Sequence, residues 1–443
     1  MTRWLPRFAW LVILSLVVFI VYRNARVNRI PDDKITIDDI RIRMMGEELV
    51  GLKALDGFLA PAQSAKLVES HERAISQLSE NAHTPADRLH VAIIAGEILG
   101  KEQALTRLDV LTHAQPDPEL EADIAALRQI YFDNATALDS SSQNRLIRRH
   151  DYFARVALAY GVASSMEPRK SIEAGGRRAT LMLGVVALIV LVMLLGGVGL
   201  FITAIVLWVK GRMRRMYVRD PDASTAYLEG FAIYFVLFFL GLGLLRRYIG
   251  WKNLQWEWLA LLIIPVVMFW FATRGSSSVE QRTALGWHTG KGIFREIGAG
   301  IAGYLVGIVV MIPGLIITYF LIKHTGLSPD NSPIFRMLEG NRWHVLGVYA
   351  LVSVYAPVME ETMFRGALFH HLRRRWGWAI SAPIVAFIFA VIHPQGWVAV
   401  PALGSIAMVL AGLREWRGSL IAPMVAHACN NFIVVTIALL VFR

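Results

Sequence analysis

Long apolar stretches alternate with polar ones along this chain, and their lengths set the expected architecture. A first apolar run at 8–22 is followed by a polar region that extends to about residue 178. Further apolar stretches lie at 180–208, 225–245, 257–273, 297–322, 343–369, 378–394, 397–413 and 418–441. Because a helix needs about 20 apolar residues to cross a bilayer, the pattern predicts an all-α polytopic membrane bundle of about nine spans.

The first apolar run resembles a signal sequence because it follows Arg3 and Arg7. The residues behind it, from Arg23 to Arg26, contain no convincing small-residue cleavage site. We therefore interpret residues 1–22 as an uncleaved N-terminal membrane anchor.

Residues 23–178 have the composition of a soluble helical domain. Thr84 and Asp117 each precede a proline, which places a capping residue before a proline at the first helical position. The pattern favours an extramembrane domain of paired helices. A repeat-like arrangement of these pairs is one option, although no repeat of fixed period is found. The histidines of this region lack ligand spacing and are expected at the solvated surface: residues 71, 83, 90, 113 and 150.

Composition and charge support a membrane protein. The chain is 55% hydrophobic and 18% charged, too apolar for an ordinary soluble protein of 443 residues. Its net charge of +11 does not require a nucleic-acid partner, because lysine and arginine accumulate on the cytoplasmic loops of membrane proteins. Cys429 is the only cysteine, which excludes an intramolecular disulfide and a thiolate metal cluster.

Two basic clusters orient the spans. Residues 210–219 and 373–375 are both expected at the cytoplasmic face. With nine spans and a cytoplasmic N-terminus, both clusters fall inside and the helical domain falls outside. This arrangement is typical of a protein of the bacterial inner membrane.

Three polar motifs occur on separate predicted spans near the end of the chain. They are Glu360-Glu361-x-x-x-Arg365, Phe389-x-x-x-His393 and His427-x-x-x-Asn431. Glu361 and Arg365 are spaced to form an ion pair on one helical face, and Glu360 remains as a free carboxylate. Charged residues at membrane depth are costly and mark functional sites.

These residue types suit the activation of water. Glu360 can act as general base, with His393, His427 and Asn431 as donors to the oxyanion of a tetrahedral intermediate. Alternatively, Glu360, His393 and His427 could bind zinc, with one position left open for water. No cofactor is firmly predicted, and zinc remains an option.

The order of the three motifs on successive helices resembles the CAAX protease and bacteriocin-processing (CPBP or Abi) family, which includes the type II CAAX prenyl endopeptidases. The resemblance covers about residues 300–441. It implies an intramembrane peptidase in which Glu360 is the catalytic base, Glu361 and Arg365 support it, and His393, His427 and Asn431 complete the site. The family has been described both as metalloproteases and as glutamate-dependent, metal-independent proteases.

The predicted domains are therefore an anchor (1–22), a helical domain (23–178), additional transmembrane helices (179–296) and a CPBP-like protease core (297–443). The expected partners are a membrane-associated, prenylated or leader-type peptide, the bilayer, and a protein bound by the helical domain. The alternative is a non-catalytic scaffold or immunity-type protein of the same fold. A transporter is disfavoured because no internal repeat with interrupted helices is found.

Overall fold

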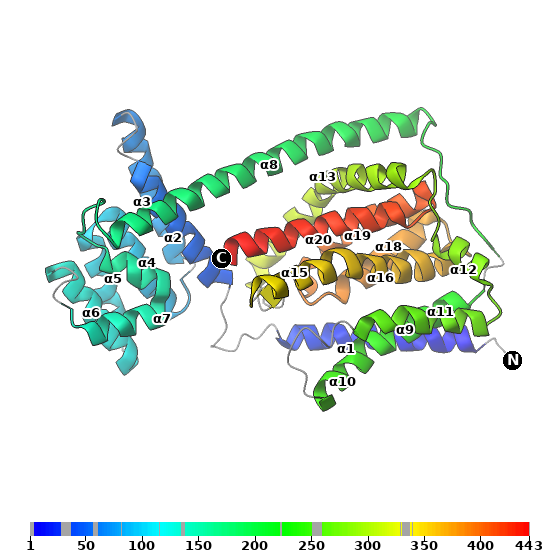
Figure 1. Ribbon diagram of the computed structural model, residues 1–443, viewed down its shortest axis with the longest axis horizontal. Helices are drawn as coiled ribbons and strands as arrows, with labels where there is room; N and C mark the ends of the chain where they lie inside the picture. The colour runs from blue at the N-terminus through cyan, green and yellow to red at the C-terminus, as the bar shows by residue number, and fades with distance from the viewer. Residues whose placement is uncertain are drawn as a thin grey trace. The chain divides into compact units, whose positions relative to one another are not determined.

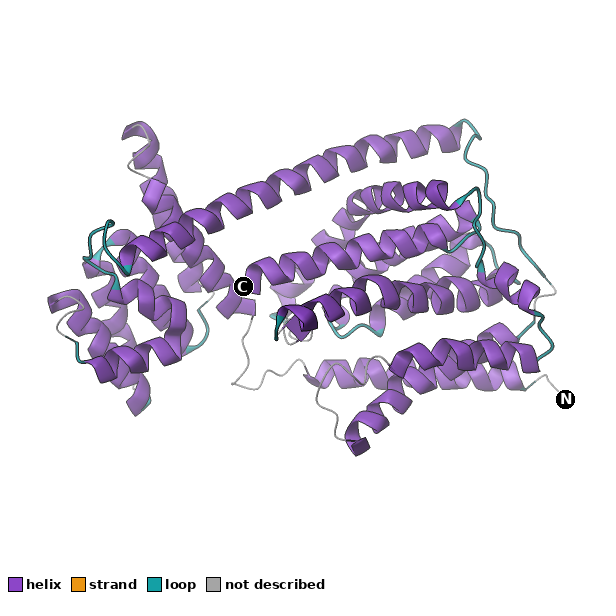
Figure 2. Cartoon of the chain, viewed as in Figure 1, coloured by secondary structure: helices purple, strands orange, loops and turns teal. Residues whose placement is uncertain are grey.

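The computed structural model is all-helical throughout the residues that it describes, and Figure 2 shows helices joined by loops with no strand among them. The described residues are 4–27, 37–55, 61–80, 82–114, 116–133, 138–221, 224–249, 259–327, 329, 337–338 and 340–442. The predicted all-α class is confirmed.

The chain divides into two compact units, each with its own core. One comprises residues 33–190, and the other comprises residues 1–32 together with 191–443. The division falls inside the long helix α8 (Arg169–Val209). The predicted domain boundaries after residues 22, 178 and 296 remain predictions.

The unit of residues 33–190 is built from short amphipathic helices packed around aliphatic side chains such as Leu89, Ile93 and Leu127. Its helices are α2 (Ile37–Leu55), α3 (Pro61–Glu80), α4 (Pro85–Leu99), α5 (Lys101–His113), α6 (Pro118–Asp133), α7 (Ser140–Leu158) and the first part of α8. At the start of α4, the Thr84 side chain accepts from the Asp87 backbone and the Asp87 side chain accepts from the Thr84 backbone. This capping box confirms the predicted helix start.

The prediction that the histidines of this unit lie at the solvated surface is wrong for three of the five. His71 and His150 are buried, and His90 is in contact with His150. The Nε2 of His150 lies 3.1 Å from Asp123 Oδ2, and the Nδ1 of His150 lies 3.1 Å from His90 Nε2. Spacing along one helix could not reveal this chain of contacts, because its members come from α4, α6 and α7.

The buried histidines predict an acid-sensitive helical unit. Burial, followed by the charge of His150, lowers the pKa of His90 from 6.5 to about 3, and burial also lowers the pKa of His150. Folding therefore favours neutral imidazoles, so their contribution to stability is complete above about pH 6.5 and is lost as the pH falls toward 3. Hydrogen exchange of α4 and α7 in the full chain should accelerate over this range, beyond the intrinsic effect of pH.

A matched pair of variants tests that assignment. His90→Phe keeps a ring to stack on Phe153, which lies 4.0 Å away between centroids, and removes the titrating group. In His90→Phe, the hydrogen exchange of α4 and α7 should therefore depend less on pH. His83→Gln changes an exposed position and should leave this pH dependence unchanged. Equal acid sensitivity in wild type and His90→Phe would contradict the assignment.

The other unit is the membrane-embedded part of an integral, multi-pass membrane protein. Its helices are α1 (Leu5–Val27), the end of α8, α9 (Ala226–Phe235), η3 (Val236–Gly241), α10 (Leu242–Ile249), α11 (Ile263–Thr273), α12 (Ser278–Leu285), α13 (Ile293–Thr325), α15 (Arg342–Ala350), η5 (Leu351–Tyr355), α16 (Ala356–Glu361), η6 (Thr362–Leu368), α17 (Phe369–Arg373), α18 (Trp378–Val391), η7 (Trp397–Ala399), α19 (Val400–Arg417) and α20 (Ile421–Phe442).

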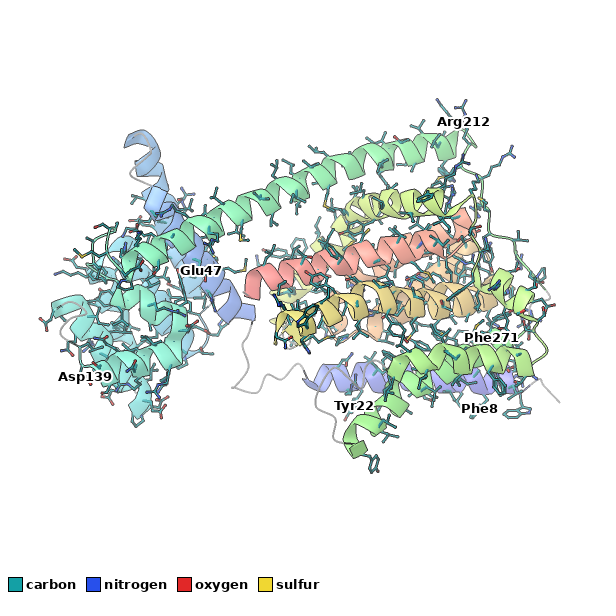
Figure 3. The ribbon with its side chains drawn as sticks, viewed as in Figure 1. Phe8, Tyr22, Glu47, Asp139, Arg212 and Phe271 are labelled. Carbon is teal, nitrogen blue, oxygen red and sulfur yellow. The ribbon has the colours of Figure 1, made fainter. Side chains whose placement is uncertain are left out.

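Two packing arrangements organise these helices. Helix α1 lies beside α9 (Figure 1), and α11 packs on α9 where Phe271, labelled in Figure 3, approaches Gly230. Helix α13 packs against α19 and α20. Gly303 faces Leu413 and Gly307 faces Ile406, so the absence of side chains on α13 lets α19 come close.

Every stretch predicted to span the membrane contains helix, but fewer than nine meet the length and composition of a span. Among the described residues, 6 helices do so, or up to 7 if the bent pair of 259–273 and 278–285 counts as one span. Helix α18 has only 14 residues because Pro394 and Gly396 follow it. The helix of residues 342–373 contains several charged side chains, which lower its hydropathy.

The basic clusters lie together at one face of this unit. Arg219 donates to the backbone carbonyl oxygens of Arg374 and Arg375 at 3.0 Å each. Arg417 pairs with Glu296 at 2.6 Å near the start of α13. The clusters therefore share a face, as the predicted topology requires, and the assignment of that face to the cytoplasm remains a prediction.

Candidate active site

The two glutamates lie on a helix that is continuous from residue 342 to 373 but is not a regular α-helix. The π-helical segments η5 and η6 flank the short helix α16, which ends at Glu361. Such segments interrupt the regular backbone hydrogen bonding and often occur at functional sites. The hydroxyl of Thr362, the first residue of η6, accepts a hydrogen bond from Trp287 Nε1 at 3.0 Å, which attaches this helix to the segment after α12.

Arg365 and Glu361 form the ion pair that their spacing predicts. Arg365 Nη1 donates to Glu361 Oε1 at 3.0 Å, and both side chains are fully buried. Arg365 Nη2 donates to the carbonyl oxygen of Ala407 on α19 at 3.1 Å. The guanidinium also lies 4.6 Å from the ring centroid of Phe389, a cation–π distance. Phe389 of the second motif thus contributes to the support of this ion pair.

His427 of α20 lies between the two glutamates. Its Nδ1 is 2.8 Å from Glu361 Oε1, and its Nε2 is 3.8 Å from Glu360 Oε2. Because a carboxylate only accepts hydrogen bonds, His427 Nδ1–H donates to Glu361. This bond fixes the ring so that Nε2 is directed to Glu360.

Glu360 is the less constrained of the two carboxylates. Its Oε2 atom is buried and has no hydrogen-bond partner among the described residues. The side chain as a whole has a relative solvent exposure of 19%. A buried oxygen without a partner is costly unless it has a role, and a water or substrate group can fill that position.

His393 follows the last turn of α18, at the break that Pro394 and Gly396 cause. Its Nδ1–H donates to the carbonyl oxygen of Phe389 at 2.5 Å, which leaves Nε2 available. The imidazole lies 4.4 Å from the Phe389 ring, and His427 lies 5.8 Å from the same ring, both between centroids. His393 is therefore near the glutamates, and its one side-chain hydrogen bond within the described part of the chain is to its own helix.

Asn24, near the end of α1, also belongs to this region. Its Nδ2 donates to the backbone carbonyl oxygen of His393 at 3.0 Å, and Asn24 is buried. A helix that ends abruptly leaves carbonyl oxygens without partners, so this bond stabilises the break that presents His393. Sequence reasoning missed Asn24 because a single amide at the end of an anchor gives no distinctive signal.

Asn431 lies one turn beyond His427 on α20, and its side-chain hydrogen bonds are to Val352 and Asn430. Its Nδ2 donates to the carbonyl oxygen of Val352 in η5 at 2.9 Å, and its Oδ1 accepts from Asn430 at 3.3 Å. Among the described residues, no hydrogen bond joins Asn431 to Glu360 or His393. The structure thus groups Glu360, Glu361, Arg365 and His427, with His393 nearby, and places Asn431 where it joins α20 to η5.

The zinc alternative has no support in the arrangement of these side chains. Within the described ranges, no three histidine, cysteine, aspartate or glutamate side chains are grouped as metal ligands. We therefore derive no step through a metal at Glu360, His393 and His427.

The buried Oε2 of Glu360, which has no hydrogen-bond partner among the described residues and lies 3.8 Å from His427 Nε2, is a group that can act as a general base. Residues 342–433 match the family model of the Rce1-like type II CAAX prenyl endopeptidases. This segment contains all three motifs, and the match confirms the family resemblance there. It supports an intramembrane endopeptidase as the class of activity. No curated protein and no solved structure matched the chain.

Proposed function

We propose that this protein is an intramembrane endopeptidase that uses Glu360 to activate water without a metal. The observation that carries the proposal is the position of Glu360. Its buried Oε2 has no hydrogen-bond partner among the described residues and lies 3.8 Å from His427 Nε2, whereas the Glu361 carboxylate is already bonded to Arg365 and His427 through Oε1. A general base must be able to accept a proton from a bound water, and a carboxylate oxygen that is not already paired can do so.

In the proposed reaction, Glu360 takes a proton from water as the water oxygen adds to the scissile carbonyl carbon. The carbonyl oxygen becomes an oxyanion, to which the second N–H of Asn431 donates after a small rearrangement. His393 can donate to it from Nε2 only as the imidazolium, because Nδ1–H is already bonded to the Phe389 carbonyl oxygen. Collapse of this intermediate breaks the C–N bond, and Glu360 returns the proton to the leaving amine. Glu361 and Arg365 hold His427 and the helix in place.

The proposed substrate is a peptide bond in a membrane-associated segment, either prenylated near its C-terminus or preceded by a leader. The matched family is named for prenyl endopeptidases, and the site lies within helices that meet the bilayer. We further propose a bacterial inner membrane location and a protein partner for the helical unit. A non-catalytic scaffold of the same fold is the second candidate, and it is favoured only if no peptide is cleaved.

Reconstituted full-length protein tests the activity directly. It should cleave a farnesylated or leader-type peptide in liposomes, and a metal chelator should leave the rate within about twofold, because the proposed base is a carboxylate. Metal content measured with and without His393→Ala completes the test. Loss of activity on chelation, restored by zinc, would contradict metal-independent catalysis. Absence of cleavage across both peptide classes would favour the scaffold.

Asn24→Ala should lower kcat by about 5- to 10-fold, because losing one hydrogen bond to a buried carbonyl costs about 1 kcal/mol and loosens the position of His393. Ser15→Ala changes an exposed position of the same helix and should leave the rate unchanged. A full rate for Asn24→Ala would show that this bond does not position the histidine.

A further inference from the structure

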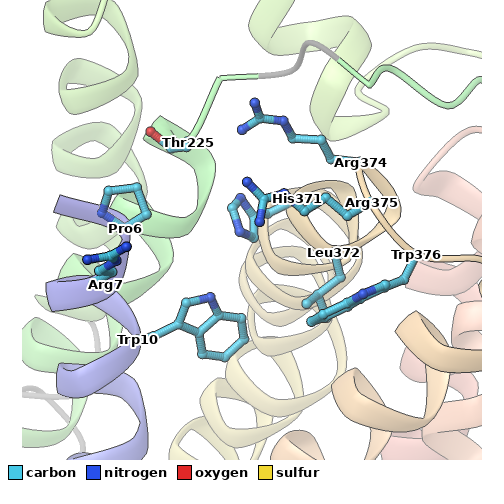
Figure 4. Close-up of a pocket in the computed structure, with 9 residues that line it drawn as sticks. All are labelled: Pro6, Arg7, Trp10, Thr225, His371, Leu372, Arg374, Arg375 and Trp376. Carbon is cyan, nitrogen blue, oxygen red and sulfur yellow. The ribbon is translucent and has the colours of Figure 1, made fainter. Parts of the chain in front are cut away.

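A second site lies at the face of the membrane unit where the basic clusters meet, and it does not depend on the proposed peptidase activity. A cavity of about 500 Å³ opens there between the first turns of α1 and the end of α17. Figure 4 shows Arg7 and Trp10 of α1 on one side and Arg374, Arg375 and Trp376 on the other. The remaining lining residues are Pro6, Thr225, His371 and Leu372.

The charge of this cavity is positive and incompletely neutralised. Three arginines and no acidic residue line it. Arg374 is held in place because its Nε donates to the carbonyl oxygen of Pro221 at 2.9 Å. The side chains of Arg7 and Arg375 form no hydrogen bond or ion pair with another described residue. Uncompensated guanidinium groups facing one cavity favour an anion, and phosphate suits them in particular.

His371 adds a second polar feature to the same cavity. Its Nδ1 is buried and has no hydrogen-bond partner among the described residues. Its ring lies 6.4 Å from that of Trp10, between centroids. His371 therefore brings a buried polar group without a partner among the described residues next to this cavity.

The rest of the cavity wall is apolar, which favours an amphiphilic ligand over a free ion. Pro6, Trp10, Leu372 and Trp376 supply this surface. Arg7 lies in the first turn of α1, whose residues 5–24 form a candidate span. Tryptophan and arginine at the end of a span lie at the depth of lipid headgroups.

We propose that this cavity binds the headgroup of an anionic phospholipid. The phosphate contacts Arg7 and Arg375, and the glycerol backbone lies against Trp10 and Leu372. A lipid bound there links α1 to α17, which belongs to the helix that contains the glutamates. Anionic lipid should therefore stabilise the folded protein in addition to occupying the cavity.

The test uses the full-length protein in detergent, titrated separately with phosphatidylglycerol, phosphatidylcholine and inorganic phosphate. Bound lipid is measured by native mass spectrometry, and the unfolding temperature is followed in parallel. Wild type should bind phosphatidylglycerol in preference to phosphatidylcholine and should be stabilised by it. Because an arginine near anionic lipid contributes about 1 kcal/mol, Arg7→Gln combined with Arg375→Gln should weaken this binding by about 10- to 30-fold.

Arg212→Gln is the matched control, since it removes an exposed arginine of the same basic face that does not line the cavity. It should bind phosphatidylglycerol as wild type does. The proposal is overturned if Arg212→Gln and the double variant lose equal affinity, which would indicate general surface attraction. It is also overturned if inorganic phosphate reproduces the full stabilisation, or if wild type does not discriminate between the two lipids. The last two comparisons need no variant.

Discussion

Glu360→Gln should reduce peptide cleavage by about 100- to 10,000-fold, the range that general acid–base catalysis contributes. The amide keeps the size of the side chain but cannot take a proton from water. Because Glu360 Oε2 makes no hydrogen bond with another described residue, the substitution should leave folding nearly unaffected. Single-turnover cleavage of a reconstituted substrate measures the effect, and the unfolding temperature reports the fold.

Glu280→Gln provides a control for the chemical change itself. Glu280 is an exposed residue in the capping box at the start of α12, outside the site, and its substitution should leave kcat unchanged. If Glu360→Gln cleaves peptide at the wild-type rate, water is activated by another group. If its unfolding temperature falls together with its rate, Glu360 supports the fold rather than the reaction.

Arg365→Met should destabilise the protein by about 3–5 kcal/mol, because it leaves the Glu361 carboxylate buried without its cationic partner. The Arg365 side chain is fully buried, and it also donates to Ala407 on α19. We expect a lower unfolding temperature and a lower yield of folded protein in detergent, both measured against wild type. Activity should fall as a consequence of the altered position of His427.

The double variant Glu361→Gln with Arg365→Met separates charge from shape. Removing both charges eliminates the unpaired carboxylate, so much of the lost stability should return. The amide oxygen introduced at position 361 can still accept a hydrogen bond from His427 Nδ1, although a weaker one. Similar stability of the single and the double variant would mean that the arginine acts through Ala407 and packing rather than through the ion pair.

The sequence predicted the site residues that share one helix better than those that meet across helices. The spacing of Glu361 and Arg365 was enough to predict their ion pair, because residues four apart face each other on a helix. The contact of His427 with both glutamates depends on how α20 packs against α16, which spacing within α20 does not determine. For the same reason the bond from Asn24 to His393, which joins residues 369 positions apart, had no signal in the sequence.

Hydropathy located each of the 6 helices that meet the criteria of a span among the described residues, but it overestimated how many stretches can span the bilayer alone. The stretch at 378–394 is mostly apolar, yet α18 ends at Val391 because the chain turns at Pro394. In the helical unit, the buried histidines were missed because their partners come from three different helices. Local pattern predicts which face of a helix is apolar, and tertiary packing decides which polar groups are buried with it.

The π-helical segments η5 and η6 have a consequence for how this chain is compared with its relatives. A π-helical turn accommodates more residues than an α-helical one, so each segment changes the register of the residues behind it. A related helix that is regular throughout would match this one only if gaps were allowed at 351–355 and 362–368. Loss of a single residue from η6 would rotate the downstream turns by about 100° relative to Glu360. In this helix, chain length therefore specifies the site as strictly as residue type does.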